Sequence, residues 1–282
     1  MAHDLHIHMV LDGLDWRAAI ARHAQGPDIP YIRQVLGRYQ AAGYTYLRDG
    51  GDRWGVGAAA RELAPAFGIT YRTPLAPLCW AGHYGSFIGE TFDSIPRYTA
   101  LVRGHKAAGA DFIKIMISGL MDFDRFGRLT EEGLTKEQIR QLIRIAHQEG
   151  MAVMAHANGA RTVEAAAEAG VDSVEHGAYL DQAALEAMAQ AGVVWVPTLS
   201  TLVGPMGKGR FPDPVLERIC ASAARNVVRY AQLGGLIGCG TDAGAWAVPH
   251  ATDLERHLLT KILEDRTEPV LSAAAEKIRE KF

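Results

Sequence analysis

The sequence has little of what marks secreted, membrane-spanning or nucleic-acid-binding proteins. It has only three cysteines, Cys79, Cys220 and Cys239, an odd number at spacings that fit neither a zinc finger nor a disulfide framework. The formal net charge of the chain is only −3, and the lysines and arginines are scattered along the sequence. No basic surface for nucleic acid or anionic lipid is therefore predicted. No apolar run approaches the roughly 18 residues of a membrane span, and no cationic-then-apolar leader precedes the first strand. We therefore expect a cytoplasmic protein with a small-molecule substrate and neither nucleic acid nor membrane as a partner.

The chain does have enough apolar content for a sizeable core. Hydrophobic residues make up 48% of its 282 residues and charged residues 22%, proportions typical of a globular protein. Short β-rich runs alternate with helical stretches, and no linker divides them. The predicted strands are 3–8, 44–49, 69–78, 111–118, 152–157, 172–177, 193–199 and 236–242. Eight alternating units favour a (β/α)₈ TIM barrel over a doubly wound sheet, as a single domain over 1–282.

The clearest predicted helices have recognisable start and stop signals. They cover 29–43, 135–150, 159–170 and 180–192, and each ends at a glycine, which tolerates the left-handed conformation found just past helix ends. Thr135 and Asp181 are of the residue types that cap helix N-termini. The regular order of helix, glycine and strand indicates that consecutive strands are parallel and joined by crossover helices throughout.

Three histidines stand in the first predicted strand, in the sequence HDLHIH. Residues two apart in a strand point to the same face with Cβ atoms roughly 6.6 Å apart, so His6 and His8 can share one metal ion while Ile7 faces away. A surface histidine cluster is the alternative for this pair alone. The strand's C-terminal end would have to open into a cavity for a metal site to form.

Other metal-binding side chains follow later strands. His156 ends the fifth predicted strand, His176 the sixth and Asp242 the eighth. Taken singly, each is explained as well by a satisfied buried histidine or a helix-capping aspartate. Because the carboxyl ends of barrel strands share one face, we expect all of them to meet His6 and His8.

Lys114 lies inside the fourth predicted strand, DFIKIMIS. Alternation places Ile113 and Ile115 against the helices and Lys114 inside the barrel. A buried ammonium is costly without a partner, and nearby cations would repel it. A neutral amine can take up CO₂ to form a carbamate that bridges two metals; the alternative is a salt bridge with a carboxylate such as Glu175.

These residues together resemble the amidohydrolase superfamily. Within it, GADFIKIMISG, VMAHANGARTVEAAAEAGVDSVEHGAYLD and IGCGTDAG are similar to imidazolonepropionase-related hydrolases and metal-dependent dipeptidases of the Xaa-Pro and Xaa-Arg type. The resemblance implies a binuclear centre, usually zinc, with one ion on His6, His8 and Asp242, the other on His156 and His176, and a carboxylated Lys114 between them. The accessory β-sandwich of most relatives looks absent, since the sequence begins at the first barrel strand.

The resemblance also implies roles in catalysis. Two divalent ions hold a bridging hydroxide that attacks a carbonyl carbon, and Asp242 carries the proton to the leaving nitrogen. His83 and Tyr179 would add hydrogen bonds to the substrate or its oxyanion. Trp80, Tyr84, Phe87 and Trp246 in the long loops are candidate walls for an apolar or flat substrate. Asn158 is a further candidate substrate contact. The candidates for binding a substrate carboxylate are Arg48, Arg53, Arg125 and Arg210.

Three functions remain open at this point. The leading one is a metal-dependent amidohydrolase that cleaves a C–N bond in a dipeptide, an N-acyl amino acid or a cyclic amide. The second is a mononuclear deaminase or decarboxylase on the same fold, against which Lys114 weighs because it stands where a bridging ligand belongs. The third is a ligand-binding barrel without turnover. A homo-oligomer is compatible with each of them.

Overall fold

The computed structural model describes residues 2–282, and their strands form two parallel sheets. One sheet has the order β1-β2-β3 and the other the order β10-β9-β8-β7-β6-β4-β5. The strands are β1 (Ala2–Ile7), β2 (Tyr44–Asp49), β3 (Thr70–Arg72), β4 (Leu78–Trp80), β5 (Glu90–Phe92), β6 (Ile113–Met116), β7 (Val153–Ala157), β8 (Ser173–His176), β9 (Val194–Val196) and β10 (Leu236–Ile237).

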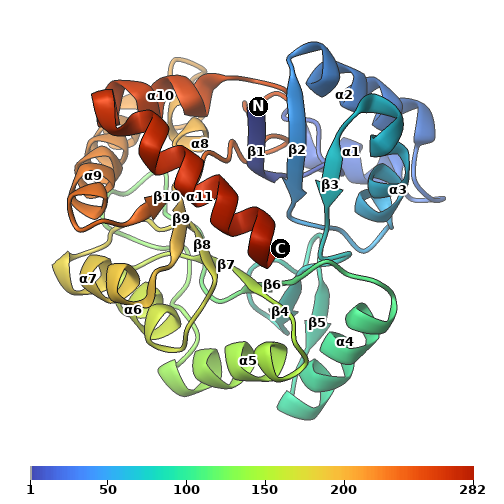
Figure 1. Cartoon of the computed structure of the whole chain (residues 1–282), viewed down its shortest axis with the longest axis horizontal. Coiled ribbons are helices and arrows are strands. Elements are labelled where there is room, and N and C mark those ends of the chain that lie inside the picture. The colour runs from blue at the N-terminus through green and yellow to red at the C-terminus, as the bar shows by residue number, and fades with distance from the viewer. Residues whose placement is uncertain (1) are drawn as a thin grey trace.

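Backbone hydrogen bonds connect the two sheets at both junctions. The Leu5 amide in β1 donates to the Cys239 carbonyl just after β10, at 2.9 Å. On the other side, the Asp111 amide before β6 donates to the Thr73 carbonyl after β3, at 3.0 Å. The strands therefore follow one another around a ring with most helices outside it (Figure 1). The predicted (β/α)₈ fold is confirmed.

The helices begin and end close to the predicted positions. Thr135 caps α5 in a capping box with Gln138, and Asp181 accepts a hydrogen bond from the Ala184 amide at the start of α7. None of the helices described between residues 2 and 282 has the length and apolar character needed to cross a bilayer. The helices are α1 (Trp16–Arg22), α2 (Ile29–Ala41), α3 (Val56–Leu63), η1 (Ala64–Phe67), α4 (Ile95–Ala107), α5 (Lys136–Gln148), α6 (Ala160–Glu168), α7 (Gln182–Ala191), α8 (Ser200–Val203), α9 (Asp213–Gln232), α10 (Leu254–Leu263), η2 (Glu264–Arg266) and α11 (Thr267–Lys281).

The third predicted strand, 69–78, is wrong as a single element. The chain forms β3, leaves the sheet, and re-enters it as β4, which pairs with β6 and β5 rather than with β2. Pro74 and Pro77 lack the amide hydrogen that a continuous ladder needs. Leu75 between them adopts a left-handed conformation, with φ of 67°. The segment after β4 also contains the short strand β5, which the sequence pattern did not predict.

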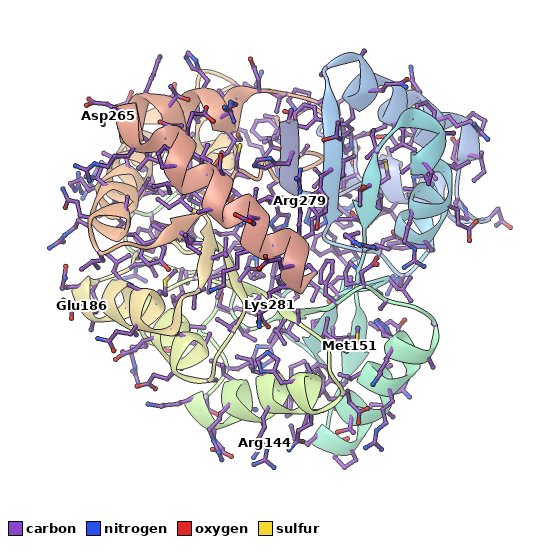
Figure 2. The ribbon with its side chains drawn as sticks, in the orientation of Figure 1. Arg144, Met151, Glu186, Asp265, Arg279 and Lys281 are labelled. Carbon is purple, nitrogen blue, oxygen red and sulfur yellow. The ribbon has the colours of Figure 1, made fainter. Side chains whose placement is uncertain are left out.

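The last helix, α11, lies across the ring of strands and closes one end of the barrel (Figure 1). Its Ala274, Ile278 and the following Phe282 pack against side chains inside the barrel, among them Leu5 and Phe112. Figure 2 labels Arg279 and Lys281 along this helix. Because apolar side chains fill this end, the opposite end, where the strands finish, is the one left for a site.

Candidate active site

The predicted site residues converge at the carboxyl ends of the strands, around a cavity of about 430 Å³. The members that line it are His8, Lys114, His156, His176 and Asp242. His6 is fully buried beside them, with its ring centroid 5.2 Å from those of His8 and His176. Residues spread over more than two hundred positions of sequence therefore form one cluster.

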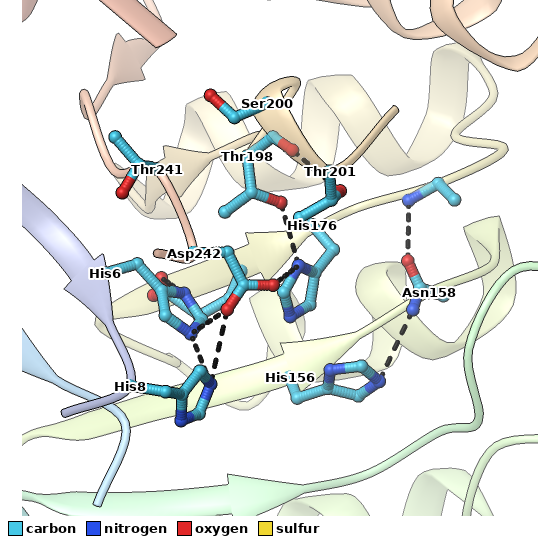
Figure 3. A network of polar contacts seen from close by, with 12 residues as sticks. His6, His8, His156, Asn158, His176, Thr198, Ser200, Thr201, Thr241 and Asp242 are labelled. Carbon is cyan, nitrogen blue, oxygen red and sulfur yellow. Dashed lines mark hydrogen bonds and ion pairs between the residues drawn. The ribbon is translucent and has the colours of Figure 1, made fainter. Parts of the chain in front are cut away.

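His6, His8 and Asp242 form a compact triangle of ligand atoms (Figure 3). The two Nε2 atoms of His6 and His8 are 3.4 Å apart, and Oδ1 of Asp242 lies 3.6 Å from the first and 3.3 Å from the second. Ligands of a tetrahedral ion bound at about 2.1 Å lie about 3.4 Å from one another. The triangle therefore has the dimensions of three corners of a zinc site.

Local backbone geometry brings this triangle together. Ile7 packs outward among apolar side chains, as alternation in β1 predicts for the residue between the two histidines. Asp242 has φ of 57°, and its amide donates to the His6 carbonyl at 2.7 Å, which fixes the turn against β1. Gly50 leaves room for the His8 ring, because a Cβ at this position would lie 2.3 Å from Cε1 of His8.

His156 and His176 form the second pair, with ring centroids 4.5 Å apart. Nε2 of His156 is 3.1 Å from the Gly119 carbonyl, an acceptor, so Nε2 carries the proton. Nδ1 of His176 is 2.8 Å from Oγ1 of Thr198. The opposite nitrogen of each ring is therefore the one available to an ion, as in metal-binding histidines oriented by a neighbouring polar group.

Lys114 is buried with no hydrogen-bond partner for its Nζ atom among residues 2–282. The alternative salt bridge to Glu175 is not formed, because the oxygens of Glu175 are engaged by His6, Arg48 and Ser173. Burial lowers the pKa of Lys114 from 10.5 to about 8. An amine that is easily neutral and has no partner fits the requirement for carbamate formation.

The protonation states also suit metal binding. Burial, and then the Lys114 ammonium, lower the pKa of His6 to about 4 and that of His156 to about 3. Burial alone would raise the pKa of Asp242, but the imidazoles of His6 and His8 hold it below its ordinary value. Neutral imidazoles and an ionised carboxylate are the forms that bind a divalent cation, so the residues present fit such a group.

Arg48 is not where a substrate carboxylate could reach it, which corrects the expectation for this residue. Its side chain is fully buried in β2, and its Nη2 donates to Oε1 of Glu175 at 2.8 Å. The run YTYLRD places Arg48 inside the barrel, below the cavity. Treating it as one of the loop arginines overlooked its position in a strand.

Four other predicted residues lie near the cavity but do not line it. Nδ1 of His83 is 3.6 Å from Oε1 of Glu131, and its side chain is 40% exposed. The ring of Tyr179 packs edge-on against that of Phe126, and the ring of Trp80 packs edge-on against that of Phe92.

Asn158, the fourth of these residues, is fully buried. Its Nδ2 donates to the Gly119 carbonyl at 3.0 Å, and Nδ2 also lies 3.4 Å from Nε2 of His156. Its position supports the His156 ring rather than a substrate contact.

The cavity walls are mostly apolar and come from the long loops. Trp246 lines the cavity as predicted, and Arg210 stands over its ring, with Cζ 4.7 Å from the ring centroid. Tyr84 and Phe87 also line the cavity as predicted, and the ring centroid of Tyr84 is 4.8 Å from that of His156. Sequence reasoning missed the contribution of the segment after β1. The apolar and aromatic wall residues are Leu11, Leu14, Trp16, Tyr84, Phe87, Ile88, Met116, Leu120, Met121, Phe123, Pro205, Phe211, Ala245 and Trp246.

Comparison with known proteins is consistent with this geometry. The family model described as "Amidohydrolase family" matches residues 68–272. Ochratoxinase of Aspergillus niger is 28% identical over 206 residues, which cover 70% of this chain and 40% of the ochratoxinase. The chain thus spans less than half the length of that relative.

Solved structures with the same fold include a Xaa-Pro dipeptidase with bound methionine in its active site. It has a TM-score of 0.76 and 22% identity, and the match covers 99% of this chain and 75% of the dipeptidase. The crystal structure of A. niger ochratoxinase also has a TM-score of 0.76, at 21% identity, with 98% of this chain and 70% of that chain covered. At 21–22% identity, these two matches show a shared fold and no more.

Proposed function

Because this chain belongs to the amidohydrolase family, we propose that it hydrolyses an amide C–N bond with a binuclear metal centre, most simply of two zinc ions. The matched region contains Lys114, His156, His176 and Asp242; β1 supplies His6, and His8 follows directly after β1. One observation carries the proposal: three ligand atoms of His6, His8 and Asp242 lie 3.3–3.6 Å apart at the cavity that also contains Lys114, a buried amine with no hydrogen-bond partner among residues 2–282.

Each residue has a defined part in this proposal. His6, His8 and Asp242 would hold one ion, His156 and His176 the other, and a carbamate on Lys114 would lie between them. Bound ions of this kind lower the pKa of water and polarise a carbonyl. The carboxylate of Asp242 is ionised at neutral pH, so it can accept the proton of the attacking water and return it to the departing nitrogen. The left-handed backbone of Asp242 directs it toward the cavity.

The cavity walls define the kind of substrate we propose. A volume of about 430 Å³ lined by aromatic side chains suits a dipeptide, an N-acyl amino acid or a cyclic amide with a bulky apolar or flat group. Arg210 is the arginine that lines the cavity, next to Phe211 and Trp246. We assign it the binding of a substrate carboxylate. His83 and Tyr179 remain candidates for hydrogen bonds to the substrate.

Metal analysis together with a substrate screen tests the proposal. Elemental analysis of purified protein should find two divalent ions per chain, and a density map should show a carbamate on Lys114. Dipeptides, N-acyl amino acids, lactams and hydantoins should include substrates whose hydrolysis stops with a chelator and returns with Zn²⁺. One ion per chain would favour a mononuclear deaminase or decarboxylase. A protein that binds metal but hydrolyses none of these compounds would favour a ligand-binding barrel.

We also propose a cytoplasmic setting and a small-molecule substrate without macromolecular partners. Cys79, Cys220 and Cys239 are all unpaired, which suits a reducing compartment. Self-association into a homo-oligomer is compatible with the fold and can be measured by light scattering.

A further inference from the structure

We infer that Glu175, Arg48 and Phe282 form a positioning column that holds the imidazole of His6 in its metal-binding orientation. The column runs through the barrel interior from the metal-binding end to the end closed by α11. The inference rests on the proposed metal centre, because it concerns how one of its ligands is oriented.

Glu175 determines which nitrogen of His6 is free. Its side chain is fully buried in β8, and Oε2 lies 2.8 Å from Nδ1 of His6. An ionised carboxylate only accepts hydrogen bonds, so Nδ1 carries the proton and Nε2 keeps its lone pair. That Nε2 is the atom 3.4 Å from His8 and 3.6 Å from Asp242. Glu175 thus selects both the tautomer and the ring plane of His6.

Arg48 holds Glu175 in place from the other side of the barrel. Its three guanidinium nitrogens donate to the Leu5 carbonyl, Oγ of Ser173 and Oε1 of Glu175, at 2.7, 2.9 and 2.8 Å. β2 lies between β1 and β3, whereas β8 lies between β7 and β9, so the pair joins strands that are not neighbours in the sheet. A buried carboxylate needs such a charge partner, and a planar guanidinium with three fixed contacts supplies it rigidly.

Phe282 closes the column next to α11. Its ring centroid is 4.7 Å from Cζ of Arg48, a cation–π distance, and its ring packs edge-on against Phe112. Only 6% of Phe282 is exposed. The neighbouring Lys281, labelled in Figure 2, pairs with Asp172 at 3.2 Å and anchors this end of the helix. Three consecutive contacts therefore connect α11 to His6.

The chemistry of the column predicts what Glu175→Gln would do. The carboxylate accepts on both oxygens, from His6 on one and from Arg48 and Ser173 on the other. A glutamine has one accepting oxygen and one donating NH₂ group, so it must turn the NH₂ either toward the His6 N–H or toward the guanidinium. Turned toward His6, the NH₂ favours the tautomer with the proton on Nε2, the nitrogen that must be free for a metal; turned toward the guanidinium, it places two donors face to face and loosens the His6 ring.

The test measures Zn²⁺ affinity of the metal-stripped, full-length protein by competition with a chromogenic chelator. Glu175→Gln should lower the affinity about ten- to a hundredfold, as loss of an orienting partner of a ligand does. Phe282→Ala should lower it by a smaller but measurable factor. The matched control is Ile278→Ala, which removes a fully buried side chain of the same α11 cluster. It should weaken thermal stability as Phe282→Ala does, yet leave Zn²⁺ affinity unchanged.

Histidine ¹⁵N NMR of the metal-free protein gives a readout that needs neither metal nor activity. His6 should be in the Nδ1–H tautomer in the wild type and lose this single state in Glu175→Gln. If the wild type hydrolyses amides but Glu175→Gln changes neither the Zn²⁺ affinity nor the His6 tautomer, this inference is overturned while the proposed function stands. Equal affinity losses in Phe282→Ala and Ile278→Ala would remove Phe282 from the column. A wild type that binds no divalent ion would overturn the proposed function and this inference together.

Discussion

Replacing Lys114 with methionine should stabilise the metal-free protein while abolishing its metal centre. The amine is buried, has no hydrogen-bond partner among residues 2–282, and has a pKa lowered from 10.5 to about 8 by burial. At about 1.4 kcal/mol per pH unit, this difference corresponds to about 3 kcal/mol of folding free energy lost below pH 8. Methionine has a similar length, is apolar and adapts to irregular core space, so it avoids this penalty.

The pH dependence of the effect follows from the sign of the shift. Folded Lys114 gives up its proton at lower pH than unfolded Lys114, so the unfolded chain holds more protons between pH 8 and 10.5. Wild-type stability therefore rises with pH across this window. The advantage of Lys114→Met should be about 3 kcal/mol at pH 7 and about 1 kcal/mol at pH 10.

Urea unfolding of chelator-treated protein in CO₂-free buffer at these two pH values measures both quantities. The control is Lys208→Met at an exposed loop position, which should change stability by less than about 0.5 kcal/mol at either pH. Metal analysis of Lys114→Met should show lost occupancy, with partial recovery by short carboxylic acids. The reasoning is refuted if Lys114→Met is no more stable than the wild type at pH 7, or if its advantage is the same at pH 10.

Three further substitutions test other parts of the site. Asp242→Asn should keep metal but lower kcat at least about a hundredfold because the proton carrier is gone; an unchanged kcat contradicts that role. Gly50→Ala should lower metal content because its Cβ would lie 2.3 Å from Cε1 of His8, whereas Gly104→Ala, with no atom within 4 Å, should bind metal normally; equal metal content in the two rejects the steric argument. Arg210→Gln should raise KM about tenfold or more for carboxylate-bearing substrates with little change in kcat, and an equal rise for their amidated forms would refute carboxylate binding.

Much of the site was predictable because strand ends carry a strong local signal. Alternation in the predicted strand 3–8 placed His6 and His8 on one face and Ile7 on the other, and in β6 it placed Lys114 inside the barrel. His156, His176 and Asp242 each lie at the end of a short predicted strand, so their convergence required only that the strands be parallel and form one barrel.

Other features depended on contacts that no local pattern encodes. Arg48 and Glu175 pair across 127 positions of sequence, and the run YTYLRD, although it places Arg48 in a strand, does not identify this partner. The break between β3 and β4 was overlooked, although Pro74 and Pro77 signal it. The cavity wall after β1 depends on how that segment folds over the strand ends.

The sequence by itself determined the order of the strands, the helix caps and the side chains that follow each strand, because periodicity and glycine positions act over a few residues. Only the tertiary structure decided which buried charges pair, how α11 closes the barrel beneath Arg48, and that Lys114 is left without a partner. Those outcomes depend on the distances between segments that are far apart in the chain. The closed barrel sets these distances, whereas local sequence does not.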